Sequence, residues 1–186
     1  GRIDIIVDGG PVGIGLESTI VDVTGEIPTV LRPGAVTMEM LEETLGRVEI
    51  DPAILGPMKE GTKPKAPGMK YRHYAPKAEM TLVEGEMEQV VRSINRLAKK
   101  SLADGKKVGI ICTDETRSCY PAGMVRSIGI RAKEETVAHN LYAVLREFDE
   151  LGADVIYSES FPGDQIGQAI MNRLTKAAGY HIIHVM

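Results

Sequence analysis

Several residue types that often mark a function are scarce in this sequence. It has no tryptophan, and aromatic residues make up 4% of its 186 positions. Its two cysteines, Cys112 and Cys119, lack the CxxC spacing of a zinc site and are too few for a disulfide framework. No apolar run approaches the roughly 20 residues that cross a bilayer, and the first residues lack the layout of a signal peptide. We therefore expect a cytoplasmic protein with no membrane contact.

Charge and composition are those of a globular protein. The sequence has 22 basic and 26 acidic residues and a net charge of −4. The overall field does not attract RNA, so a contact with RNA would have to be local. Hydrophobic residues make up 43% of the chain, which is enough for a packed core in one ordinary domain or two small ones.

Residues 1–50 have the pattern of the end of an α/β domain. Stretches of β-branched and apolar residues predict strands at 3–8, 18–23 and 28–32. Thr37 is expected to cap a helix over 38–45 that ends at Gly46. Because the chain runs straight into the first strand-like stretch, we expect it to be a fragment of a longer protein.

Residues 51–79 are predicted to be a linker. Five of the ten prolines fall here together with three glycines, and no regular element is expected to persist through so many breakers. The part at 66–79, APGMKYRHYAPKAE, is unusual for a linker because it combines aromatic and basic side chains. Such groups suit stacking on, or pairing with, a nucleotide. The alternative is that Tyr71 and Tyr74 only pin the linker to a domain.

Strands and helices alternate over residues 80–186. The expected strands are 80–85, 108–113, 127–131, 154–160 and the final HIIHV, and the expected helices lie near 87–103, 137–151 and 166–178. This alternation predicts a small Rossmann-like α/β domain, with a mainly parallel sheet covered by helices on both faces. Asn172, Arg173 and Lys176 share one face of the last helix. That face is predicted to be either solvated or docked on another domain.

The glycine-rich stretch GGPVGIG at 9–15 has two interpretations. Glycine lets backbone N–H groups approach a phosphate closely. A phosphate loop opens a helix, however, whereas this stretch precedes a predicted strand and lacks both the GK[ST] ending and the full GxGxxG. An ordinary flexible connection is the favoured interpretation.

Three polar residues near strand ends are candidates for ligand binding. Ser18 and Thr19 lie where the glycine-rich stretch becomes a strand, so either hydroxyl could meet a polar ligand. Arg32 ends an apolar strand and is followed by Pro33 and Gly34, which restrict its position. Such an arginine suits phosphate or carboxylate recognition, and the alternative is a surface salt bridge of little energy.

Three motifs occur in a specific order along the chain: GLESTIVDVTGEIPTVLRPG (15–34), PGMKYRHYAP (67–76) and GQAIMNRLTKAA (167–178). Together they resemble the YrdC/YwlC family of threonylcarbamoyl-AMP synthases, in the long form with an extra carboxyl-terminal domain. The resemblance spans nearly the whole chain. It implies that 1–50 is the end of a YrdC-like catalytic domain, 51–79 a linker and 80–186 an accessory domain.

The resemblance also implies a reaction. Family members use ATP, L-threonine and bicarbonate to form threonylcarbamoyl-AMP and pyrophosphate, and the product serves a downstream tRNA threonylcarbamoyl transferase complex. By resemblance, Ser18 helps to hold threonine, Arg32 contacts ATP, and Tyr71 reaches the nucleotide. ATP is then a substrate, Mg²⁺ is expected with ligands outside this sequence, and no metal ligand is assigned within it.

One departure from the family pattern limits this expectation. The family's basic Lys/Arg motif and its Ser-Ala-Asn stretch, which bind substrate and phosphate, are absent from the sequence. Phosphoryl chemistry needs several cationic groups around the phosphates, and one arginine cannot supply them. The chain alone is therefore expected to be inactive. The alternative function is a non-catalytic binding or regulatory module, centred on 80–186, that contacts RNA or a protein partner.

Overall fold

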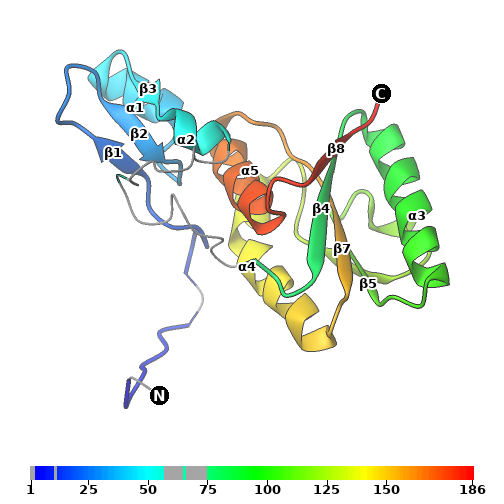
Figure 1. Ribbon diagram of the computed structural model, residues 1–186. Coiled ribbons are helices and arrows are strands. Elements are labelled where there is room, and N and C mark those ends of the chain that lie inside the picture. The colour runs from blue at the N-terminus through cyan, green and yellow to red at the C-terminus, as the bar shows by residue number, and fades with distance from the viewer. Residues whose placement is uncertain (1–2, 11, 57–64, 66–74) are drawn as a thin grey trace.

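The computed structural model describes residues 3–10, 12–56, 65 and 75–186. Figure 1 shows two separate sheets, the smaller built by the first part of the chain and the larger by the second. Helix α5 (Gln165–Ala177) lies on the side of the larger sheet that faces the smaller one. No helix in this described part is long and apolar enough to cross a membrane.

The smaller sheet has the strand order β1-β2-β3. β1 (Ile20–Asp22) and β2 (Thr29–Arg32) are antiparallel, and β3 (Glu49–Ile50) runs parallel to β2. The helix predicted after β2 is confirmed as α1 (Met38–Leu45). Its ends are the expected ones, because the Thr37 hydroxyl accepts a hydrogen bond from the Met40 N–H and Gly46, with a φ of +77°, ends the helix.

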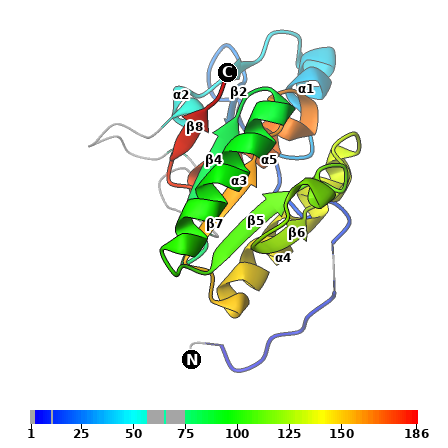
Figure 2. The ribbon, with the colours of Figure 1, turned by 90° about the vertical axis from the view of Figure 1, so that its right-hand side faces the viewer.

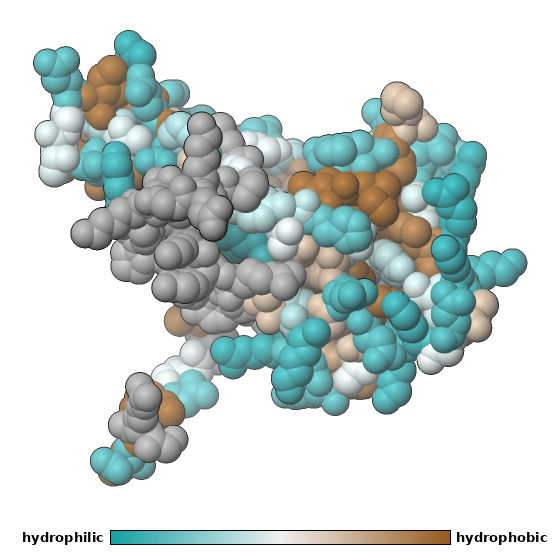
Figure 3. Space-filling model, viewed as in Figure 1, coloured by the Kyte–Doolittle hydropathy of each residue, from teal (hydrophilic) through white to brown (hydrophobic). Residues whose placement is uncertain are grey.

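The strand predicted at 3–8 is wrong. These residues have no regular structure and extend away from both sheets in Figure 1. Their apolar side chains are exposed, Val7 at 90%, and the space-filling view of Figure 3 shows this segment standing clear of the body. A β-branched stretch becomes a strand when a neighbouring strand takes its backbone hydrogen bonds. No described residue pairs with this segment.

The segment 51–79 also contains a regular element that was not expected. A short helix, α2 (Pro52–Leu55), follows β3 directly, and the Asp51 carboxylate accepts a hydrogen bond from the Ala53 N–H at 2.9 Å. Proline at the first position of a helix loses no hydrogen bond and brings a suitable φ. Pro52 therefore starts a helix here, and the prediction of no regular element at this proline is wrong.

The larger sheet has the order β6-β5-β7-β4-β8, and all four of its strand pairs are parallel. Its strands are β4 (Glu79–Glu84), β5 (Val108–Cys112), β6 (Met124–Ser127), β7 (Val155–Glu159) and β8 (Ile182–His184). The connecting elements are α3 (Met87–Ala103), the short 3-10 helix η1 (Arg117–Cys119), α4 (Glu134–Leu151) and α5. The predicted parallel α/β domain is therefore confirmed.

Helices cover both faces of this sheet. Figure 2 shows α3 in front of the strands and α4 and α5 behind them. Alternate strand residues serve the two layers, as the period of a strand requires. Ile110 packs in the cluster under α3, whereas the adjacent Ile111 packs under α4 and α5, and both are fully buried.

One predicted strand of this sheet is displaced. The strand expected at 127–131 is β6 and ends at Ser127. Gly129 adopts a φ of +143°, a conformation that takes the chain out of an extended ladder. An added Cβ at Gly129 would also lie 2.5 Å from the Thr136 hydroxyl, so the turn packs tightly against the start of α4.

Candidate functional site

The structure brings Ser18 and Arg32 together. Ser18 precedes β1, Arg32 ends β2, and the antiparallel register places Arg32 opposite Ile20. The Arg32 guanidinium donates from Nε to the Ser18 carbonyl at 2.9 Å and from Nη2 to the Ser18 hydroxyl at 3.1 Å. Two candidates chosen separately from the sequence therefore lie at one place on the edge of the small sheet.

Thr19 has a different environment from Ser18. Its hydroxyl donates to the Val36 carbonyl at 2.7 Å. A Cβ at Gly34 would lie 2.5 Å from the Thr19 N–H nitrogen, so only glycine lets these segments pack so closely. The Ser18 side chain is exposed. This difference favours Ser18 over Thr19 as the ligand contact, and that role remains a prediction.

Arg173 reaches this edge from α5. It donates from Nε and Nη2 to one carboxylate oxygen of Glu17, at 3.0 and 2.9 Å, and from Nη1 to the Pro33 carbonyl at 2.5 Å. Its side chain is 6% exposed. The adjacent Asn172 is also buried and donates to the Ile54 carbonyl at 3.3 Å. Of the two interpretations of this helix face, docking is therefore confirmed for Asn172 and Arg173.

A residue on a second helix also donates a hydrogen bond to Glu17. The hydroxyl of Tyr142, in α4, donates to the same Glu17 oxygen at 2.7 Å. Burial raises the pKa of Glu17, but the hydrogen bond from Tyr142 and the charge of Arg173 outweigh it, so the pKa lies below its usual value. Burial and the hydrogen bond to Glu17 raise the pKa of Tyr142. The carboxylate is therefore ionised and the phenol neutral at neutral pH.

Cationic groups outnumber anionic ones among the described residues around this edge. Burial, followed by the nearby charge of Arg173, lowers the pKa of Lys176, and Arg32 acts in the same direction. Among the described residues, the cations Arg32, Arg173 and Lys176 thus lie near one carboxylate, that of Glu17, and Arg173 contacts it directly. Such an excess favours a ligand with phosphate or carboxylate groups. No group of three or more His, Cys, Asp or Glu side chains that could hold a metal ion lies among the described residues.

The glycine-rich stretch has a packing role. Residues 12–19 lead into β1 and open no helix. An added Cβ at Gly15, whose φ is +77°, would lie 2.6 Å from the His139 Cα on α4. Glycine is thus needed here for close approach of two backbones. The phosphate-loop interpretation has no support from this geometry.

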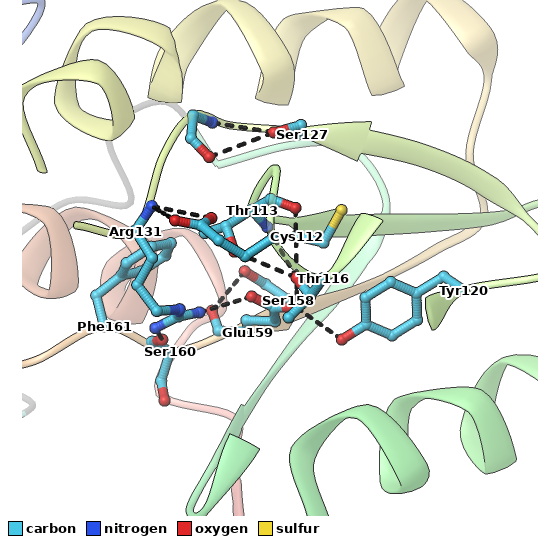
Figure 4. A network of polar contacts seen from close by, with 12 residues as sticks. Cys112, Thr113, Thr116, Tyr120, Ser127, Arg131, Ser158, Glu159, Ser160 and Phe161 are labelled. Atoms are coloured by element: carbon cyan, nitrogen blue, oxygen red, sulfur yellow. Dashed lines mark hydrogen bonds and ion pairs between the residues drawn. The ribbon is translucent and has the colours of Figure 1, made fainter. Parts of the chain in front are cut away.

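A second polar cluster, drawn in Figure 4, was not predicted from the sequence. Glu159, fully buried at the end of β7, accepts hydrogen bonds from Thr116 at 2.5 Å and Tyr120 at 2.8 Å, and pairs with Arg131 at 2.6 Å. Arg131 also stacks over the Phe161 ring, 4.8 Å from its centroid. The signal in the sequence was a glutamate inside an apolar strand, which needs partners when buried. The cluster ties the loops around β5 and β6 to β7.

Tyr71, the third predicted site residue, lies outside the described residues. The two remaining candidates and the contacts from α4 and α5 define a class of protein. It is an α/β protein in which a small mixed sheet carries a cationic cluster, and helices of a parallel-sheet unit hold that cluster in place.

Comparison with known proteins identifies the class more closely. The family described as "Threonylcarbamoyl-AMP synthase, C-terminal domain" matches residues 36–179. The chain is 46% identical over 183 residues to the threonylcarbamoyl-AMP synthase of Bacillus subtilis, covering 98% of this chain and 51% of the relative. It is 45% identical over 185 residues to that of Pyrococcus abyssi, covering 100% of this chain and 52% of the relative.

A solved structure agrees with these relatives. The crystal structure of P. abyssi Sua5 complexed with L-threonine has a TM-score of 0.89 and 43% sequence identity, and covers 100% of this chain and 52% of that one. The chain therefore belongs to the threonylcarbamoyl-AMP synthase family, through its carboxyl-terminal domain. It spans about half the length of the curated relatives it matches.

Proposed function

We propose that the full-length protein forms threonylcarbamoyl-AMP and pyrophosphate from ATP, L-threonine and bicarbonate, for the modification of tRNA in the cytoplasm. The observation that carries this proposal is the Ser18–Arg32 pair at the edge of the small sheet, where the described residues supply more cations than anions. Membership of the family supports the product named in its description, and the threonine complex of the P. abyssi relative supports threonine as a substrate.

Each residue has a proposed role in this reaction. The exposed Ser18 hydroxyl contacts threonine, and Arg32 contacts ATP. Arg32 Nη2 donates a hydrogen bond to the Ser18 hydroxyl. Substitution of either residue should therefore change the position of the other side chain. Tyr71 is proposed to reach the nucleotide from the linker. Mg²⁺ would neutralise the charge of the phosphates, and its ligands are proposed to lie outside this sequence.

The chain alone is proposed to be inactive. Nucleotidyl transfer depends on several positioned cations around the phosphates, and residues beyond those of this sequence must contribute most of them. The product would pass to a downstream tRNA threonylcarbamoyl transferase complex, and a direct RNA contact of this protein would have to be local, given the net charge of −4.

The test is an assay of the full-length protein with ATP, threonine and bicarbonate, followed by pyrophosphate release and mass spectrometry of the product. We expect pyrophosphate release that requires threonine, and a Ser18→Ala variant that raises the threonine KM more than the ATP KM. ATP turnover that is independent of threonine would overturn the proposal. Binding of RNA without any turnover would favour a non-catalytic module.

A further inference from the structure

Arg173 touches both segments that carry the candidate site residues. Glu17, which its Nε and Nη2 contact, immediately precedes Ser18, and Pro33, which its Nη1 contacts, immediately follows Arg32. One guanidinium on α5 therefore joins the two strand ends of the small sheet. Arg173, on a helix that covers the larger sheet, therefore holds the backbone next to Ser18 and next to Arg32.

The geometry of this contact is specific to arginine. All three nitrogens of one planar group contact Glu17 or Pro33, which lie on different segments, and the side chain is 6% exposed. Lysine has a single ammonium group at the end of a flexible stem and cannot hold a carboxylate and a carbonyl in this fixed relation. Loss of the fork should therefore free the two segments relative to each other.

Neighbouring contacts hold the same segment from α4. Tyr142 donates to the Glu17 carboxylate at 2.7 Å, and Gly15 lies against the α4 backbone at His139. The stretch that leads to Ser18 is thus seated on two helices, α4 and α5. Its position depends on those helices as well as on the small sheet.

Other contacts between the two parts of the chain lie elsewhere. Tyr180, after α5, donates to the Gly56 carbonyl at 3.3 Å, next to α2. This bond connects the same two parts of the molecule but touches neither Ser18 nor Arg32 nor Arg173. Tyr180→Phe is therefore a matched control, because it loosens the joint without disturbing the edge that carries the site.

We propose that Arg173 is a positioning residue for the substrate site, and that α5 sets the affinity of the site for threonine and ATP through Glu17 and Pro33. This rests on the proposed function for the identity of the ligands. Arg173 contacts no substrate in this scheme. It holds Ser18 and Arg32 at the separation in which both can meet their ligands.

The first test compares Arg173→Lys with Tyr180→Phe in the full-length protein. We expect Arg173→Lys to raise the KM for threonine on the order of tenfold or more, with a smaller change in kcat and a melting temperature close to that of Tyr180→Phe. The proposal is overturned if Arg173→Lys keeps the KM values of the parent, or if Tyr180→Phe raises them equally.

The second test does not depend on activity. Amide hydrogen exchange should be faster at residues 18–22, 30–32 and 34 in Arg173→Lys than in the parent, and unchanged there in Tyr180→Phe. Equal exchange in all three proteins would overturn the positioning role, whatever the substrate. If Arg173→Lys shows this faster exchange but the parent has no threonine-dependent turnover, the positioning role stands and the proposed function is overturned.

Discussion

Glu17 and Arg173 are 156 positions apart in the sequence and form an ion pair with a distance of 2.9 Å between Oε2 and Nη2. The arginine is almost wholly buried, at 6% exposure, and the glutamate is 26% exposed. A buried ion pair is weak evidence for stability, but removal of one partner leaves the other charge buried without compensation, which destabilises the fold. The pair therefore makes the joint between the small sheet and α5 sensitive to the ionisation of Glu17.

This sensitivity predicts acid lability. The folded-state pKa of Glu17 lies below its usual value of 4.5, so its contribution to the free energy of unfolding is fully present above about pH 4.5 and is lost as the pH falls through the lower folded-state pKa. Glu17→Gln should abolish that part of the pH dependence. Urea unfolding of both proteins from neutral pH to about pH 3 measures it. Parallel pH profiles for the two would contradict the expectation.

The Glu159 cluster predicts a large effect of a small change. Glu159→Gln removes a fully buried charge from Arg131, and we expect a loss of about 3 kcal/mol or more in the free energy of unfolding. The control is Glu147→Gln, which breaks the partly exposed pair with Arg126 and should cost about 1 kcal/mol or less. Urea unfolding distinguishes the two, and equal losses would show that the buried cluster has no special role.

The two thiols are predicted to differ in reactivity. Burial, aided by the charge of Glu159, raises the pKa of Cys112 to about 12, whereas Cys119 is exposed. The thiolate is the reactive form, so a disulfide reagent should label Cys119 in the native protein and label Cys112 only after denaturation. Cys119→Ser provides the control, since it should leave no fast-reacting thiol. Rapid native labelling of Cys112 would mean that the α3 layer opens readily.

Much of the fold followed from local patterns in the sequence. α1 is predicted at its observed bounds because Thr37 and Gly46 mark its ends, and the range 87–103 predicted for α3 also matches its observed bounds. The errors came from contacts that a local pattern does not contain. Residues 3–8 have a strand-like composition but no partner strand among the described residues, and Pro52 was interpreted as a breaker although it occupies the first position of a helix.

The candidate site was predicted in part. Ser18 and Arg32 stood out because each lies at a strand end, and the structure pairs them. The role of Arg173 could be narrowed only to two alternatives, because a basic residue on a helix face is compatible with solvent or with docking. Its partners, Glu17 and Pro33, lie more than a hundred positions away in the sequence. The residue pattern of α5 alone therefore cannot predict them.

Residues 80–186 are predicted to fold without the rest of the chain. They contain the parallel sheet except Glu79, the first residue of β4, together with both of its helix layers, which is what an independent hydrophobic core requires. Expressed alone, this piece should unfold in a single cooperative transition and give well-dispersed amide resonances. A broad, featureless melt would place the domain boundary elsewhere.

The claim that Arg32 binds ATP at the edge of the small sheet is tested most directly by calorimetric titration of ATP into the full-length protein. Arg32→Ala is compared with the parent and with Arg47→Ala, whose arginine is 74% exposed and pairs only with the partly exposed Glu49 among the described residues. We predict that Arg32→Ala weakens the ATP Kd on the order of tenfold or more, with little change in melting temperature, and that Arg47→Ala leaves the Kd unchanged. An Arg32→Ala protein that binds ATP as tightly as the parent would contradict this assignment.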